Sequence, residues 1–436
     1  MFSTSLGTGR KEAGTFMLEQ LFNKSNRKSE NRADRRKRMR DNDPASETYS
    51  GPWGGFEDEG EKSSELQQQL AAREEQVKLL KGDQEVRGDA KADSSSADMA
   101  TSVFHGKRMQ DWQGRAWTQP PASLAQRADG EACYLPKKLV HTWKGHSMGV
   151  QAIRLFPGSG HLLLSASMDS TIKMWDYFND RECRMTYTGH VQGVRDIQFA
   201  HEGSKFYSAS FDTKVNLWDT ETGKIVSTFG NDKMSYCVAV HPTDGDSIVV
   251  GNENRKAIQY DAKSGKVVQE YNEHLGTVSS VTFCDEGRKI VTTSDDRKIF
   301  IWNYGIPVVD KYISEPHMHA VPAVAVHPSG QYFAGQSMNN TIVVYQANGQ
   351  FKFQSKKRFH GHANAGYAIQ PAFSNDGKYL VSGGSEGSVH FWDWKSTKLY
   401  RSLKAHDGVC MGAIWHPTQA SRVVTCGWES AIKLWD

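Results

Sequence analysis

Residues 145–176 read GHSMGVQAIRLFPGSGHLLLSASMDSTIKMWD, a stretch that begins with Gly-His and ends with Trp-Asp. Between these ends lie short apolar runs separated by Gly, Ser and Asp, which is typical of short β-strands joined by tight turns. The same ending returns at Trp218-Asp219, Trp392-Asp393 and Trp435-Asp436, and the variants Tyr260-Asp261, Trp302-Asn303 and Tyr345-Gln346 fall between these. Successive aromatic residues of the endings are 43, 42, 42, 43, 47 and 43 residues apart. The chain is therefore repetitive from about residue 136 onward.

A second landmark has the same period. His146, His190, His274, His362 and His406 follow Gly, Gly, Glu, Gly and Ala, and they are 44, 84, 88 and 44 residues apart, or one, two, two and one periods. The two landmarks together resemble the WD-repeat family, in which each repeat of roughly 40–45 residues forms one four-stranded blade of a β-propeller. Seven aromatic endings then predict an all-β, seven-bladed WD-repeat propeller over residues 136–436.

The resemblance implies that a hydrogen-bonded chain of four side chains ties each complete repeat together. The predicted members are His146, Ser167, Asp169 and Trp175 in the first repeat, His190, Ser210, Asp212 and Trp218 in the second, and His274, Ser294, Asp296 and Trp302 in the fourth. A buried polar network is favourable only if every member has a partner. The third and fifth repeats lack Gly-His. The aligned acidic position holds Asn339, Glu386 and Glu429 in the last three repeats. We expect these blades to depend more on packing.

The register of the repeats predicts how the ring closes. Trp435-Asp436 ends the third strand of the last blade, so the fourth strand has to come from elsewhere. Residues 138–143, KLVHTW, have strand character and precede the first Gly-His. We predict that they complete the seventh blade, which leaves only short, protected sheet edges.

Residues 1–135 differ in character and are predicted to form a largely disordered or extended arm. Residues 24–40 hold nine basic and two acidic residues, whereas residues 41–61 hold seven acidic residues and no basic one. Such a segment buries too little apolar surface to offset its chain entropy. Residues 64–81 contain no Gly or Pro and predict a helix, either solvated and marginal or docked in a groove of a partner.

Composition excludes several classes of function. The net charge is only +3, which is not that of a polycation. The chain shows no apolar run long enough for a membrane span and no secretory signal, and its six cysteines form no Cys-x-x-Cys pair, which favours free thiols in a reducing compartment. Motifs of a P-loop, a nucleophile elbow or a zinc protease are missing. We therefore expect no catalytic site, no metal, no cofactor and no small-molecule substrate. Protein partners are expected on the loops of the ring.

Two arm segments indicate which family of WD-repeat proteins the sequence resembles. One comprises NDPAS at 42–46 and YSGPW at 49–53, and the other comprises HGK at 105–107 and DWQGRAW at 111–117. Together with PKKLVHTWKGH at 136–146, they are similar to a family of WD-repeat pre-mRNA splicing factors of the second catalytic step. The resemblance implies a nuclear, non-catalytic scaffold of the spliceosome. The alternative is a WD-repeat adaptor of another complex, such as a substrate receptor of a ubiquitin ligase.

Aromatic residues of the arm are candidate anchors for protein partners. Gly51, Pro52 and Trp53 place a rigid backbone beside a large exposed aromatic side chain, which suits an anchor that orders on binding. The alternative is that Trp53 folds back onto the propeller. The second candidate segment contains Trp112, Gly114, Arg115 and Trp117, which contact either a partner or the wall of the propeller.

The basic run has three interpretations. Its central residues are Arg35, Arg36, Lys37, Arg38 and Arg40. They form a nuclear localisation segment, a contact to an RNA backbone, or a solvated tail. The run contains no interleaved aromatic residues, which disfavours base stacking.

Overall fold

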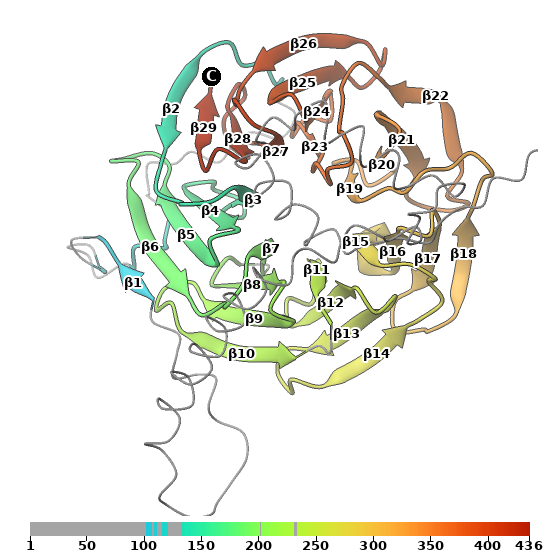
Figure 1. The fold of residues 1–436 in the computed structure, drawn as a ribbon, viewed down its shortest axis with the longest axis horizontal. Coiled ribbons are helices and arrows are strands. Elements are labelled where there is room, and N and C mark those ends of the chain that lie inside the picture. The colour runs from blue at the N-terminus through green and yellow to red at the C-terminus, as the bar shows by residue number, and fades with distance from the viewer. Residues whose placement is uncertain (1–101, 107–108, 111–115, 121–131, 201, 231–232) are drawn as a thin grey trace, which may run out of the picture. The chain divides into compact units, whose positions relative to one another are not determined.

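The computed structural model describes residues 102–106, 109–110, 116–120, 132–200, 202–230 and 233–436. These residues form seven antiparallel β-sheets that follow one another along the chain and close into a ring (Figure 1). The seven-bladed propeller predicted from the repeat spacing is thus confirmed. The basic run 24–40, the acidic segment 41–61 and the predicted helix 64–81 lie outside the described residues.

Each blade has four strands of the ring in meander order. Blade 1 contains β3 (Val150–Leu155), β4 (Leu162–Ser167), β5 (Thr171–Asp176) and β6 (Cys183–Thr188). Blade 2 contains β7 (Val194–Phe199), β8 (Lys205–Ser210), β9 (Lys214–Asp219) and β10 (Ile225–Gly230). Blade 3 contains β11 (Ser235–Val240), β12 (Ser247–Asn252), β13 (Ala257–Asp261) and β14 (Val267–Tyr271). Blade 4 contains β15 (Val278–Cys284), β16 (Lys289–Ser294), β17 (Ile299–Asn303) and β18 (Val309–Ile313).

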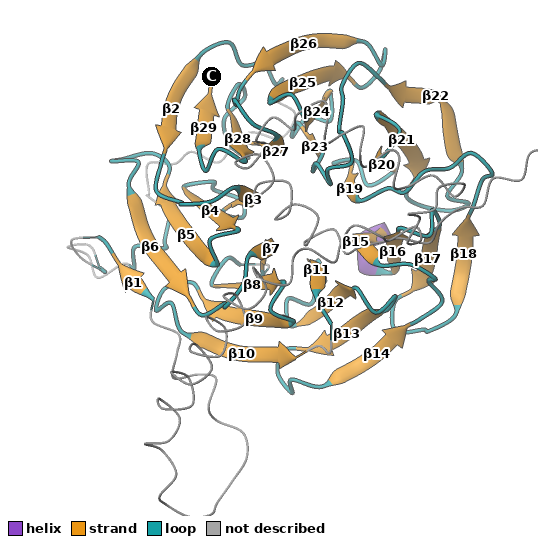
Figure 2. Ribbon diagram, in the orientation of Figure 1, coloured by secondary structure: helices purple, strands orange, loops and turns teal. Residues whose placement is uncertain are grey.

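The remaining blades follow the same plan. Blade 5 contains β19 (Ala323–Val326), β20 (Tyr332–Ser337), β21 (Thr341–Gln346) and β22 (Phe353–Phe359). Blade 6 contains β23 (Ala372–Phe373), β24 (Tyr379–Gly383), β25 (Ser388–Asp393) and β26 (Leu399–Lys404). Blade 7 contains β27 (Cys410–Trp415), β28 (Val423–Gly427) and β29 (Ile432–Trp435) together with β2 (Leu139–Trp143). The described helical structure is one 3₁₀ turn at Asp285–Gly287, which Figure 2 shows beside β15 and β16.

Ring closure depends on the strand that precedes the first repeat. β2 pairs with β29 in antiparallel register, with Leu139 opposite Trp435 and Trp143 opposite Ile432. The seventh sheet therefore joins a strand from the start of the propeller to three strands from the end of the chain. In Figure 1 the first strand of each blade lies innermost, and β2 lies on the outside of blade 7.

The core lies between neighbouring blades. Each sheet packs on another sheet on both faces, so the middle strands are buried throughout and lose the alternation of a half-exposed strand. β4 and β12 are buried along their whole length. Tyr207 and Phe229 of blade 2 pack with Ile248 of blade 3 in one apolar cluster. The stability of a blade therefore depends on its neighbours.

Part of the predicted arm belongs to the ring. β1 (Val103–Phe104) adds a fifth strand to blade 1 by pairing with β6. Cys133 is buried in the core between blades 6 and 7, and its backbone N–H donates to Asp376 Oδ2 at 2.8 Å. The boundary at residue 135 was therefore placed too far along the chain, since these short segments carry too few residues to show a strand pattern.

The six cysteines all lie in the described residues and form no disulfide with one another, and all except Cys183 are buried. Burial raises the pKa of Cys237, Cys284 and Cys426 to about 12, so these thiols remain neutral at physiological pH. Within the described residues, no helix combines the length and the apolar character that a membrane span needs.

Candidate protein-interaction surface

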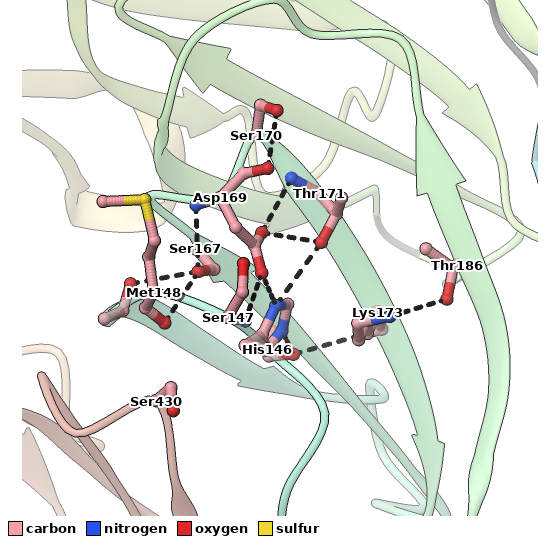
Figure 3. Close-up of polar contacts among 12 residues, drawn as sticks. His146, Ser147, Met148, Ser167, Asp169, Ser170, Thr171, Lys173, Thr186 and Ser430 are labelled. Atoms are coloured by element: carbon pink, nitrogen blue, oxygen red, sulfur yellow. Dashed lines mark hydrogen bonds and ion pairs between the residues drawn. The ribbon is translucent and has the colours of Figure 1, made fainter.

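Buried hydrogen-bonded chains fix the loops on one side of the ring. In blade 1, His146 Nε2 lies 2.8 Å from Ser165 Oγ, and Trp175 Nε1 donates to the same oxygen at 2.8 Å. The other ring nitrogen, His146 Nδ1, lies 2.9 Å from Asp169 Oδ2 (Figure 3). His146 precedes β3 and Asp169 lies between β4 and β5, so these two loops meet on the same side of the blade. We call this side of the propeller, with the loops that carry His146, His190, His274 and His406, the histidine face.

The hydroxyl group in these chains is not the predicted one. Blades 2 and 4 use Ser208 and Thr292, so the assignments of Ser167, Ser210 and Ser294 were wrong. The correct and the predicted residues lie two positions apart on the same side of a strand. Two residues of strand span about 6.6 Å, so only the nearer hydroxyl is within reach of the tryptophan. Ser165 is opposite Lys173, two residues before Trp175.

The predicted serines instead hold the loop that follows their strand. Ser167 Oγ donates to the carbonyl oxygens of Met148 and Gly149, both at 3.1 Å, and accepts from the backbone N–H of Asp169 at 3.2 Å. Ser210 makes the equivalent contacts to Gln192, Gly193 and Asp212. Two hydroxyls per repeat therefore have separate structural roles.

The carboxylates clamp the loops that carry the histidines. Asp169 Oδ2 also accepts from the backbone N–H of Ser147 at 3.0 Å, and Asp212 and Asp296 do the same for Val191 and Leu275. Burial alone would raise the pKa of Asp169, but hydrogen bonds from His146 and Thr171 outweigh it and hold the pKa well below its usual range. The carboxylates remain ionised at neutral pH, which strengthens each clamp.

Blade 7 keeps a complete chain despite its glutamate. His406 Nδ1 lies 2.8 Å from Glu429 Oε1, and His406 Nε2 and Trp435 Nε1 reach Thr425 Oγ1 at 2.9 and 3.1 Å. Burial would raise the pKa of Glu429, but hydrogen bonds from Lys433, Asp407 and His406 lower it to about 2. The expectation that blade 7 depends more on packing than the complete repeats was therefore wrong, because the longer glutamate side chain reaches the histidine.

Blade 6 lacks the hydrogen-bonded chain of His, Ser or Thr, and Trp side chains. Trp392 Nε1 donates to the carbonyl oxygen of His360 at 2.9 Å, and His362 Nε2 lies 2.7 Å from the amide of Gln336 in blade 5. The Nδ1 atoms of His362 and His390 are buried and have no hydrogen-bond partner in the part of the chain that the structure describes. Burial lowers the pKa of both imidazoles, so they are neutral at pH 7.

Clamped loops present apolar side chains to solvent on the histidine face. Val191 and Leu275 each directly follow a histidine of the hydrogen-bonded chains, and they are 84% and 67% exposed. Met148 is 53% exposed. Their loop backbones are held by the carboxylate hydrogen bonds described above. An exposed apolar side chain on a fixed backbone loses little entropy when a partner covers it, so these residues are suited to protein contact.

The inner strands surround a cavity of about 620 Å³. Arg154 of β3 lines it and donates to Gln198 Oε1 at 3.0 Å, to Gln370 Oε1 at 2.7 Å and to Asp196 Oδ1 at 2.9 Å. The guanidinium group thereby links blades 1, 2 and 6. This half-buried cluster joins three blades at the inner wall of the ring.

His-Pro pairs at the end of the blades opposite the histidine face connect neighbouring repeats. They were not predicted from the sequence. His416 Nε2 donates to the carbonyl oxygen of Gly160 in blade 1 at 3.1 Å, and His327 Nε2 donates to Gly377 in blade 6 at 3.0 Å. Both glycines have positive φ, at 64° and 68°, and a Cβ there would lie 2.6 Å from the imidazole. The available signal was the spacing of His241-Pro242, His327-Pro328 and His416-Pro417, which is two periods each time.

Of the predicted arm residues, Trp117 lies on the wall of the propeller. Its ring packs on Phe104 with centroids 5.6 Å apart, and its Nε1 donates to the carbonyl oxygen of Glu221 in blade 2 at 3.4 Å. The assignment of Trp117 to partner binding is corrected accordingly, since its ring covers the apolar edge of blades 1 and 2. The other arm candidates lie outside the described residues, namely Gly51, Pro52, Trp53, Trp112, Gly114, Arg115 and the basic residues Arg35, Arg36, Lys37, Arg38 and Arg40.

The seven sheets and the His–Ser/Thr–Trp chains define a WD-repeat β-propeller. The family model described as WD domain, G-beta repeat matches residues 137–176, 181–219, 265–303, 311–346, 353–393 and 397–436. The unmatched residues 220–264 hold β10 and the first three strands of blade 3, and this third repeat lacks the Gly-His pair.

The chain belongs to the pre-mRNA-processing factor 17 family. It is 44% identical over 419 residues to Pre-mRNA-processing factor 17 of Mus musculus, which covers 93% of this chain and 70% of the relative. The same identity and coverage hold for the Homo sapiens protein. The protein of Saccharomyces cerevisiae is 34% identical over 402 residues, with 88% of this chain and 86% of the relative covered.

Proposed function

We propose that this chain is a non-catalytic scaffold protein of nuclear pre-mRNA splicing, acting around the second transesterification step. The observation that carries the proposal is the 44% identity over 93% of the chain to relatives named for pre-mRNA processing. The similarity extends beyond the ring into the arm, which a shared propeller fold alone would not require. In this role the propeller binds spliceosomal proteins.

The geometry of the histidine face supports a binding role. Hydrogen-bonded carboxylates hold its loops, and Val191, Leu275 and Met148 project from them. Rigid loops on a closed ring give several partners fixed positions relative to one another. The scaffold would thus order partners during the rearrangement between the two reaction steps.

The arm adds a second set of contacts in this proposal. β1 and Trp117 of the arm contact blades 1 and 2. Trp53 is the proposed anchor on a partner, and residues 35–40 are candidates for nuclear localisation or contact with an RNA backbone.

The proposal is tested by depletion and add-back in a yeast or human splicing extract. Removal of the resident family member should make lariat intermediate accumulate, and adding this chain should restore exon ligation. A variant with serine at Met148, Val191 and Leu275 should recruit poorly without a change in its melting temperature. Serine at Val226, Val268 and Tyr312, which are also exposed but lie on outer strands, serves as the control.

Two outcomes would contradict the proposal. One is that depleted extract completes the second step at the normal rate. The other is that the chain, purified from nuclei, brings down a cullin complex and no small nuclear RNA, which would favour the ubiquitin-ligase adaptor instead.

A further inference from the structure

Bulged residues occur at the same position, the second residue of the innermost strand, in five blades. The pairing of the first and second strands shifts after the first residue of β3, β7, β11, β15 and β27. The residues skipped by these shifts are Gln151, Arg195, Tyr236, Ser279 and Met411. A bulge re-aims its side chain, and bulges are common beside binding sites. Arg195 is the charged member of this set, and it lines the central cavity with Tyr236 and Ser279.

Arg195 forms no ion pair among the described residues, in contrast to Arg154, although the neighbouring Asp196 carboxylate attracts its charge. Among the described residues its one hydrogen bond is donated by Nη1 to Gln151 Oε1 at 3.0 Å, and no ion pair includes it. The neighbouring carboxylate, Asp196, is occupied by Arg154 and by the backbone N–H of Val238. The carboxylate nearest the Ser279 position, Asp295, accepts from Ser279 and Thr277.

The surroundings of Arg195 make its charge costly. Burial lowers the pKa of Arg195 below its ordinary value, although a guanidinium still stays protonated at neutral pH. The adjacent Cys237 thiol is neutral because burial raises its pKa to about 12. The attraction from Asp196 is shared with Arg154, so an anionic group entering the cavity would add to the stabilisation of the Arg195 charge.

The size and the lining of the cavity indicate which class of molecule brings the anionic group. A volume of about 620 Å³ accommodates a few amino-acid residues, and Pro322, Val324 and Ala325 give part of the wall an apolar surface. Binding of nucleic acid usually uses several cations that follow the phosphate backbone. The described lining of this cavity combines Arg154 and Arg195 with Asp196, Asp285 and Glu286, and part of it is apolar. Acidic residues beside the two arginines disfavour a phosphate backbone, which favours a peptide over RNA.

We propose that Arg195 forms an oxyanion-binding site in the central channel for a glutamate or phosphoserine side chain of an extended partner peptide. The peptide enters from the histidine face, because Arg195 lies one residue after the start of β7 on that side. Apolar wall residues contact its neighbouring side chains. The inference deepens the proposed scaffold function by naming the chemical class of one bound segment.

The test measures binding of short fluorescent peptides to the full chain by anisotropy. Three peptides of alternating alanine and one variable residue carry glutamate, phosphoserine or glutamine, and an oligouridylate is the fourth probe. We expect the two anionic peptides to bind at least about tenfold more tightly than the glutamine peptide, because a charge-assisted hydrogen bond to a partly buried guanidinium supplies the difference. The tighter of the two identifies the physiological oxyanion.

Arg195→Gln should weaken binding of the anionic peptides by about tenfold or more and leave the melting temperature equal or higher, since it removes a desolvated charge and retains an amide near Gln151. Arg255→Gln is the matched control, because it removes an exposed charge from the same face outside the cavity and should change neither quantity. Arg195→Lys should retain part of the binding.

The proposal is overturned if no anionic peptide binds, if the glutamine peptide binds equally, if Arg195→Gln leaves binding unchanged, or if only the oligouridylate binds. A melting temperature lowered by several degrees in Arg195→Gln would also overturn it, because the arginine would then be structural. Peptide binding is measured on the isolated chain, so a failed splicing add-back leaves this result independent of the proposed function.

Discussion

At the scale of single residues, removal of the Ser165 hydroxyl tests how much the buried hydrogen-bonded network contributes to stability. Ser165→Ala would leave His146 Nε2 and Trp175 Nε1 buried without their shared oxygen. An unsatisfied buried polar group costs about 1–3 kcal/mol, so we expect ΔG of unfolding to fall by at least about 2 kcal/mol. Urea unfolding measures this loss. The control is Ser147→Ala in the neighbouring loop, where the side chain is exposed, and it should change ΔG of unfolding by less than about 0.5 kcal/mol. Equal effects of the two variants would show that the hydrogen-bonded side chains of blade 1 contribute no stability.

The same residues show where sequence-based prediction succeeds. The period fixed the positions of His146, Asp169 and Trp175, because each is marked by a distinctive residue type at a constant spacing. The repeat contains two hydroxyl positions, Ser165 and Ser167, and composition does not separate them. Only the strand register, which sets Ser165 opposite Lys173, decides which one reaches the tryptophan.

At the scale of elements, contacts between blades were harder to predict than contacts within them. A repeat pattern shows which residues recur in each blade, whereas the His416–Gly160 contact joins residues 256 positions apart. The short arm strand β1 was likewise not predicted, since two residues give no periodic signal. Closure by residues 138–143 could be predicted because a strand was missing from the count.

The contact between blades 7 and 1 can be tested at its glycine. Gly160→Ala places a Cβ 2.6 Å from His416 Nε2 at a φ of 64°, so it combines backbone strain with loss of the hydrogen bond. We expect a loss of about 3 kcal/mol in ΔG of unfolding. Gly158→Ala is the matched control, because its φ is 70° with open space around the added methyl group, and its loss should be about 1 kcal/mol. Indistinguishable losses would mean that this histidine does not hold the ring closed.

At the scale of the whole molecule, the ring combines two kinds of polar connection. Ionised carboxylates such as Asp169 clamp the loops of the histidine face, whereas neutral imidazoles such as His416 join blades at the opposite end. His416 Nδ1 accepts from the backbone N–H groups of Thr418 and Gln419, both at 3.2 Å, while Nε2 donates. An imidazole with both roles has to be uncharged. The closed ring therefore requires neutral histidines at one end and charged carboxylates at the other.

This requirement predicts that the propeller loses stability in mild acid. Burial lowers the pKa of His161, His362 and His416 to about 4, so between pH 6.5 and 4 the unfolded chain binds protons at these positions that the folded chain does not. Each should contribute a loss of about 2 kcal/mol in ΔG of unfolding between pH 7 and pH 5. Urea unfolding at both pH values measures the loss. His416→Gln should reduce it by about 2 kcal/mol even though the variant is less stable throughout, and the exposed His317→Gln should leave it unchanged. A wild-type stability that is constant from pH 7 to pH 5 would contradict the neutral-histidine requirement.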